Sequence, residues 1–336
     1  MRYYELTITP QNTDSPADEK AMLCTGVTSQ KSQKKQSPIA FSSLKKDGTH
    51  NPHALQIEFD LPISGFHDPV GNGNNAYIRL SGIPFDLINQ ARDLNNSLVE
   101  LHGGMSKGLP LVNPEQRGLI MSGQVFQCFG NWQGENTTLD IVVMPLGSTT
   151  GNYTFQWKAG TKMVDMIGQT LKRNHPDYTI KSIISDKLVL SNDETGMYGT
   201  IAQFASYVFQ KSKSIITDLG YQGVTIVVQG KTIIIQDGSS TKKPKAIKYT
   251  DIIGQPTWLG VGIMQLKTNM RADLFVGDFI TLPENAVKMA TKATQGYKKN
   301  KTTFDGNYQI TDLRHLGNSR QPDANSWVTI INCIEQ

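Results

Sequence analysis

The stretch that decides the fold is GNYQITDLRHLGNSRQPDANSWVTIINCI, residues 306–334. Apolar and polar residues alternate at both of its ends, and Gly, Asn and Pro gather between them. This alternation, interrupted by turn residues, is typical of two antiparallel strands joined by a loop. Residues such as Tyr308, Ile310 and Trp327 suit a pleated, half-buried surface. The stretch therefore predicts a strand pair, and nothing in it has the pattern of a catalytic site.

The preceding segment, IGQPTWLGVGIMQLKTNMRADLFVGDFITL (253–282), has the same texture. Its alternation predicts strands at 260–266 and 274–281. Residues 242–336 are therefore expected to form one β domain, with Trp327 in its core.

A further β domain is predicted over residues 1–148. In ALQIEFDL (54–61), Ile57, Phe59 and their apolar neighbours alternate with polar residues, which predicts a strand with one buried face. The other elements expected here are strands at 76–82, 97–101, 118–129 and 138–144 and a short helix at 85–94. A flexible basic segment, 25–53, is either a solvated loop or an arm that becomes ordered against a partner subunit.

The middle of the chain, 149–241, has a different pattern. Thr200 is a candidate N-cap, and it precedes apolar residues at helical spacing, among them Phe204 and Val208. Another helix is predicted at 161–174, and strands are predicted at 178–184, 187–190 and 224–235. The fold class is therefore mainly β, with a small α+β domain inserted between two β domains.

Composition limits the possible functions. The 336 residues contain 30 Gly and 15 Pro, which favours turns and short strands, and the net charge of +4 argues against a dedicated nucleic-acid binder. The cysteines Cys24, Cys128 and Cys333 form no CxxC and are expected to be free thiols. No apolar run is long enough to span a membrane, and the N-terminus has no apolar signal core, so Sec export is not expected.

Two short motifs match patterns of catalytic or cofactor-binding sites, but their surroundings do not fit. GMSKG (104–108) matches G-x-S-x-G, but the two prolines that follow exclude the helix that a nucleophile elbow at Ser106 needs. GNGNNA (71–76) matches a relaxed dinucleotide fingerprint, yet a strand follows it where a helix should begin. We therefore expect turns at both places.

Histidines and carboxylates give no stronger signal. His50, His53 and His67 lack further ligands at metal-binding spacing. Glu58 and Asp60 lie on the polar face of a strand, away from any cleft. We expect no catalytic residue, no metal and no cofactor. The alternatives left open are a cell-wall-directed hydrolase, using Ser106 or carboxylates, and a module that binds surface glycans.

A family resemblance rests on the C-terminal stretch. The order Y-x-I-x-x-L, H-x-G and W-x-T resembles the signature of phage tail baseplate hub proteins, and it is formed here by Tyr308, Ile310, Leu313, His315, Gly317, Trp327 and Thr329. Segments 254–282 and 106–145 are similar to other blocks of the same family, in the same order. The family is that of contractile-tail hub or late control protein D-like proteins, related to the hub part of type VI secretion spikes. The loop 318–326 is longer than the loop between these two motifs in the family's sequence pattern.

The resemblance implies an architecture and a role. Two tube-like β-barrel domains would flank the inserted domain, and a homotrimer would form a ring that joins a hexameric tail tube to the central spike, leaving a channel for the genome. Implied partners are the tail tube protein, the spike, the tape measure protein and other baseplate subunits, with DNA only in transit and no membrane. Such a protein belongs to the virion and is assembled in the host cytoplasm. The residues that we expect in core packing or assembly are Tyr308, Ile310, His315, Trp327, Trp258, Phe59 and Phe204.

Overall fold

Strands dominate the chain, and most of them belong to one large sheet. The computed structural model describes residues 2–10, 37–67, 75–106, 113–146, 151–239, 243–283, 304 and 306–335. Its 13-stranded sheet follows the path β14-β15-β18-β17-β3-β4-β7-β6-β5-β1-β2, with β13 and β16 attached beside β17. The prediction of a mainly β fold is confirmed.

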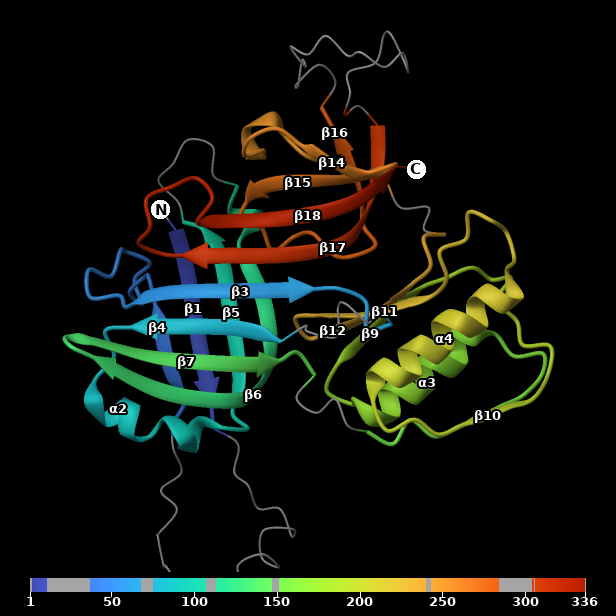
Figure 1. Cartoon of the computed structure of the whole chain (residues 1–336), viewed down its shortest axis with the longest axis horizontal. Coiled ribbons are helices and arrows are strands. Elements are labelled where there is room, and N and C mark those ends of the chain that lie inside the picture. The colour runs from blue at the N-terminus through green and yellow to red at the C-terminus, as the bar shows by residue number, and fades with distance from the viewer. Residues whose placement is uncertain are drawn as a thin grey trace, which may run out of the picture.

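The first β unit comprises the elements up to β7. Figure 1 shows β1 and β5 lying behind β3 and β4 and crossing their direction, so this part of the sheet curls around a core. Buried side chains such as Leu6 on β1 and Ile57 on β3 fill that core. The elements are β1 (Arg2–Thr9), β2 (Ile39–Ser42), β3 (Gln56–Ile63), β4 (Ala76–Ser81), α2 (Phe85–Asn89), η2 (Ala91–Leu94), β5 (Leu98–Met105), η3 (Pro114–Gln116), β6 (Gly118–Gln133) and β7 (Asn136–Met144).

The inserted unit packs two helices on a three-stranded sheet (Figure 1). The Thr200 hydroxyl accepts a hydrogen bond of 3.2 Å from the Gln203 N–H, so Thr200 caps α4 as predicted. The expected strand at 187–190 is wrong, since this segment follows a turn and contributes one isolated bridge, from Val189 to Lys162. The elements are β8 (Phe155–Trp157), α3 (Met163–Asn174), β9 (Thr179–Ile183), β10 (Glu194–Gly196), α4 (Ile201–Ile215), β11 (Thr225–Gln229) and β12 (Thr232–Gln236).

The second β unit completes the large sheet. The strand predicted at 274–281 begins only at Phe279, because the Asp278 carboxylate accepts the Phe275 N–H and closes a turn in which Gly277 has a φ of 88°. The elements are β13 (Lys245–Ala246), η4 (Tyr249–Asp251), β14 (Thr257–Gly260), β15 (Ile263–Asn269), β16 (Phe279–Leu282), β17 (Gly306–Asn318) and β18 (Trp327–Glu335).

Strand β17 joins the two β units. Its first part pairs with β16, and its last part pairs with β3, from Leu313 opposite Ile63 to Asn318 opposite Glu58. Along its other edge it pairs with β18. The strands expected in two barrels are therefore continuous within one sheet.

Three hydrophobic cores lie in this framework, one mainly in each unit. The inserted sheet belongs to two of them: Ile233 and Ile235 face the helices, whereas Ile234 packs into the core of the second β unit. The alternation of side chains along β12 thus attaches the insert to the large sheet. No helix in the described part of the chain is long and apolar enough to cross a membrane.

Candidate functional site

The junction between the two β units gathers three of the predicted residues. The ring of Trp327 meets Phe59 edge-to-face at 5.2 Å, and its indole N–H donates to the Gly104 carbonyl over 2.8 Å. Gly317 lies opposite Phe59 in the strand register, and a Cβ there would stand 2.2 Å from the Phe59 ring. Trp327 therefore packs in the core of the first β unit, and its predicted place in the core of the last domain is corrected.

His315 lies in the same junction and is fully buried. Its Nδ1 is 3.0 Å from the Thr329 hydroxyl oxygen. The same oxygen accepts a hydrogen bond of 3.0 Å from the backbone N–H of Arg271. Burial lowers the pKa of His315 to about 4, so the imidazole is neutral at neutral pH. An imidazole enclosed in this way supports packing and has no access to a substrate.

The other predicted residues lie elsewhere. The Trp258 ring stacks on Phe304 with 5.6 Å between the ring centroids, and its centroid lies 6.3 Å from that of Tyr308. Ile310 is buried in the same core of the second β unit. Phe204 is buried in the core of the inserted unit. The structure therefore distributes the predicted residues over all three cores and does not bring them together into one site.

A buried ionic cluster at the junction was not predicted. The Arg271 guanidinium, 5% exposed, lies 3.2 Å from Asp251 and 2.7 Å from Asp273. Gln116, from the first β unit, donates to the same Asp251 oxygen over 3.0 Å. Gln116 and Asp251 are far from Arg271 in the sequence, and all these residue types are usually exposed, so no local pattern could have indicated the cluster.

A second contact that was not predicted fixes the long loop 318–326. The Arg2 guanidinium donates to the backbone carbonyls of Asn318 at 2.5 Å and Asp323 at 2.6 Å, and also to that of Gln321. Arg320 in turn donates to the Ala54 carbonyl at 2.8 Å. These hydrogen bonds attach the loop 318–326, which is longer than in the family pattern, to the first β unit.

The motifs tested for catalysis remain apart. Ser106 is buried at the end of β5, and residues 107–108 of its motif and 71–74 of the dinucleotide-like motif lie outside the described residues. His50 and His53 are exposed, whereas His67 stacks on Phe209 of α4 at 4.3 Å. Within the described ranges, no group of three His, Cys, Asp or Glu could hold a metal ion.

Carboxylates on the outer face of the sheet are paired. Asp60 accepts from Arg314 over 2.7 Å, and Asp140 accepts from Arg79 over 2.7 Å and from Asn131 over 2.5 Å. Burial alone would raise the pKa of Asp140, but hydrogen bonds from Tyr77 and Arg79 hold it below its usual value. A carboxylate held ionised by its partners cannot act as a general acid.

Two buried thiols are equally unsuited to chemistry. Cys128 and Cys333 are free, as predicted, and burial raises the pKa of each to about 12. Because the thiolate is the nucleophile, both groups are inert at neutral pH.

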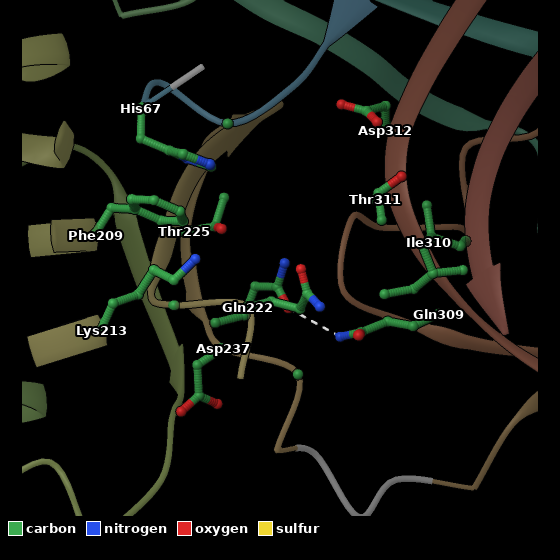
Figure 2. Close-up of a pocket in the computed structure, with 15 residues that line it drawn as sticks. His67, Phe209, Lys213, Gln222, Thr225, Asp237, Gln309, Ile310, Thr311 and Asp312 are labelled. Atoms are coloured by element: carbon green, nitrogen blue, oxygen red, sulfur yellow. Dashed lines mark hydrogen bonds between the residues drawn. The ribbon is translucent and has the colours of Figure 1, made fainter. Parts of the chain in front are cut away.

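A polar groove separates the inserted unit from strand β17. It consists of two cavities of about 270 and 460 Å³, which share Gln222, Asp237 and Gln309. Figure 2 shows His67, Phe209 and Lys213 on one wall and Gln309, Ile310 and Thr311 on the other.

The polar groups of this groove are already engaged. The Asp237 carboxylate accepts hydrogen bonds from the Ser185 and Ser239 N–H groups and from the hydroxyls of Ser239 and Tyr221. Gln309 donates to Gln236 over 3.0 Å, the contact drawn in Figure 2. The groove is a polar boundary between units, and among the described residues it contains no paired nucleophile and base.

Comparisons with known proteins found similar solved structures but no matching family. No protein-family model matches the sequence, and no curated protein is significantly similar to it. Among solved structures, the chain is similar to the c3393 protein of Escherichia coli, a component of the type VI secretion system described as structurally similar to T4 bacteriophage tail proteins gp27 and gp5. The identity is 9% and the TM-score 0.46, over 84% of this chain and 73% of that one.

Two further structures are similar over the same share of the chain. A tail protein from Neisseria meningitidis MC58 is 10% identical with a TM-score of 0.47, and 96% of it is covered. The 43 kDa tail protein of prophage MuSo2 from Shewanella oneidensis is 8% identical with a TM-score of 0.47, and 98% of it is covered. Identities and TM-scores this low assign neither a family nor a function to this chain.

Proposed function

We propose that this chain is a structural adaptor of a phage or phage-like tail, a baseplate hub that joins the tail tube to the central spike. The observation that carries the proposal is the shared strand β17, which pairs with β16, β18 and β3 and so makes one body of two β units. The order of sequence blocks that resembles hub proteins adds to it. An adaptor under load needs such a body, because a hinge between the units would let the attached parts move.

Symmetry explains why two β units per chain are useful. A homotrimer of such chains presents six β units around its axis and can match a hexameric tube on one face, while its own threefold symmetry matches a trimeric spike on the other. The genome would pass through the centre of the ring once the spike has left. DNA is then a passenger, which agrees with the mild net charge of +4.

The contacts at the junction suit a mechanical role. Backbone pairing between β17 and β3, the Trp327 indole in the first core and the Arg271 cluster cross from one unit to the other. The strand pairing resists sliding of the strands, and the Trp327 ring resists separation of the two units. The Arg271 cluster resists rotation of one unit relative to the other. The Arg271 guanidinium, the Trp327 ring and the His315 imidazole are all buried at this junction, and we propose no enzymatic activity.

The proposal is tested by the mass of the purified chain. Native mass spectrometry and sedimentation velocity should give a homotrimer, alone or with its spike. A chain that remains monomeric under both conditions contradicts the ring. A tape-measure gene upstream and a spike gene downstream of the gene for this chain would support the assignment independently.

A further inference from the structure

An exposed pair of aromatic rings lies where the β6–β7 hairpin meets α2 (Figure 1). Trp132 is 65% exposed and Phe85 51%, whereas Trp157 and Trp327 are 2% and 3% exposed. The two exposed rings meet edge-to-face, with 5.1 Å between their centroids and 89° between their planes. Because tryptophan is highly buried on average, an exposed one in an ordered contact is a candidate for binding.

The corner between these rings is held by its surroundings. The Trp132 indole N–H donates to the Gly134 carbonyl over 2.5 Å, and Gly134 has a φ of 60°, which allows the tight hairpin turn. On the other side, Ile88 of α2 packs so closely on β6 that a Cβ at Gly130 would stand 2.5 Å from it. The two rings are therefore held in place before a ligand arrives, and this lowers the entropy cost of binding.

The charges beside this corner are negative. Residues 82–91, GIPFDLINQA, and 124–138, QVFQCFGNWQGENTT, contain two charged side chains, Asp86 and Glu135, and both are acidic. Asp86 belongs to the first turn of α2 and Glu135 to the hairpin turn, and both are exposed. The cation–π contacts among the described residues lie elsewhere, so no described lysine or arginine covers either ring.

An organic cation is the ligand that this combination suits. The face of an aromatic ring carries negative potential and attracts a cation placed over it, most strongly for tryptophan. A primary ammonium is strongly hydrated, and an open corner compensates poorly for the water that it would have to lose. A quaternary ammonium group has no N–H to hydrate and presents methyl groups to the rings, so it fits this corner better.

We propose that Trp132 and Phe85 bind a quaternary ammonium group of the choline type. The methyl groups lie against the two ring faces, and Asp86 and Glu135 supply negative potential beside them. The site does not depend on the proposed adaptor role, because its residues lie outside the junction between the β units. Either proposal can therefore fail while the other holds.

Proton NMR of the ligand tests the site on the full chain. In titrations of tetramethylammonium and of choline with the protein, the ring currents of Trp132 and Phe85 should shift the methyl resonances upfield in a saturable way. The Kd is expected to be on the order of millimolar, because cation–π contacts at exposed sites are weak. Dimethylbutanol, the uncharged isostere of choline, should bind at least about tenfold more weakly, since it has the same shape and no charge.

Four variants locate the binding. Trp132→Ala should abolish the shift, and Trp132→Phe should retain part of it. Asp86→Asn combined with Glu135→Gln should weaken binding several-fold and remove most of its dependence on salt. Phe126→Ala is the matched control, because Phe126 is 56% exposed on the same strand, and it should bind as the wild type does. Thermal unfolding confirms that each variant is folded.

Two further probes identify the source of the choline group. Phosphatidylcholine vesicles present it on a lipid headgroup, and choline-linked agarose presents it on a polymer. Retention of the protein by either one, reversed by free choline, supports the proposal and names the source. Retention by neither overturns the assignment to choline.

Other results also overturn the proposal. If tetramethylammonium shows no saturable shift, or if dimethylbutanol binds as well as choline, the corner is not selective for a cation. If methylguanidinium binds more tightly than tetramethylammonium, the corner takes an arginine side chain of a partner protein instead. A shift that persists in folded Trp132→Ala, or that Phe126→Ala loses equally, places the binding elsewhere.

Discussion

The junction between the β units and the groove beside the inserted unit are two boundaries of different construction. At the junction, strands β3 and β17 pair through their backbones, and aromatic rings close the space. At the groove, cavities of about 270 and 460 Å³ lie between the walls, and the hydrogen bond between the Gln236 and Gln309 amides bridges the two walls. Because the junction is the more closely packed boundary, we expect substitutions there to cost far more stability than substitutions at the groove.

The largest effect is expected at the Arg271 cluster. Arg271→Leu leaves Asp251 buried without its cation, and breaking a buried pair in this way costs about 3–5 kcal/mol. Denaturant unfolding measures the loss, with Arg92→Leu, an exposed arginine of η2, as the control. A cost for Arg271→Leu no greater than that of the control would show that the cluster does not hold the junction.

Trp327→Ala should have a similar or slightly smaller effect. It removes a buried ring and the hydrogen bond to the Gly104 carbonyl, a loss of about 3–5 kcal/mol for a large aromatic residue. Trp132→Ala, at an exposed tryptophan, should change the stability of the monomer by no more than about 0.5 kcal/mol. Equal effects of the two substitutions would mean that Trp327 does not anchor the junction.

The junction should also weaken in acid. The folded-state pKa of His315, about 4, lies below the value of about 6.5 for an unfolded histidine, so the unfolded chain binds a proton first. Stability therefore falls as the pH drops from about 6.5 towards 4, by up to about 3 kcal/mol. Unfolding at a series of pH values measures this decline, and it should be smaller in a folded His315→Gln variant. The same decline in that variant would assign it to other groups.

The groove should tolerate substitution. Gln309→Met removes the amide hydrogen bond to Gln236, and because water can replace it in the groove, the cost should be about 0.5–1.5 kcal/mol. If this substitution destabilises the protein as much as Trp327→Ala does, the groove contributes as much to stability as the junction, contrary to our expectation.

The smallest effect is expected for Ser106→Ala, which tests the alternative that the protein is a cell-wall hydrolase. Ser106→Ala should leave the effect of the protein on cell-wall material unchanged, because Ser106 is buried at the end of a strand. Release of soluble fragments from purified cell wall measures this. Release by the wild type that disappears in a folded Ser106→Ala variant would favour the enzyme.

The local elements could be predicted from sequence because their signals are local. The Thr200 cap with the apolar stripe of α4, and the alternation of β17 and β18, are read from neighbouring residues. The pairing of β17 with β3 could not be read in this way, since it joins Leu313 to Ile63 across most of the chain. For the same reason the sequence predicts the wrong core for Trp327 and does not indicate the contact of Gln116 and Asp251 with Arg271.

The central claim is that this chain forms a ring-shaped adaptor at the junction of tube and spike. Electron cryomicroscopy of purified tail particles tests it most directly. The account predicts three copies of the chain around the tail axis, between the tube and the spike, with both β units in the ring. A single copy, or copies placed along the tube or the tail fibres, would contradict it.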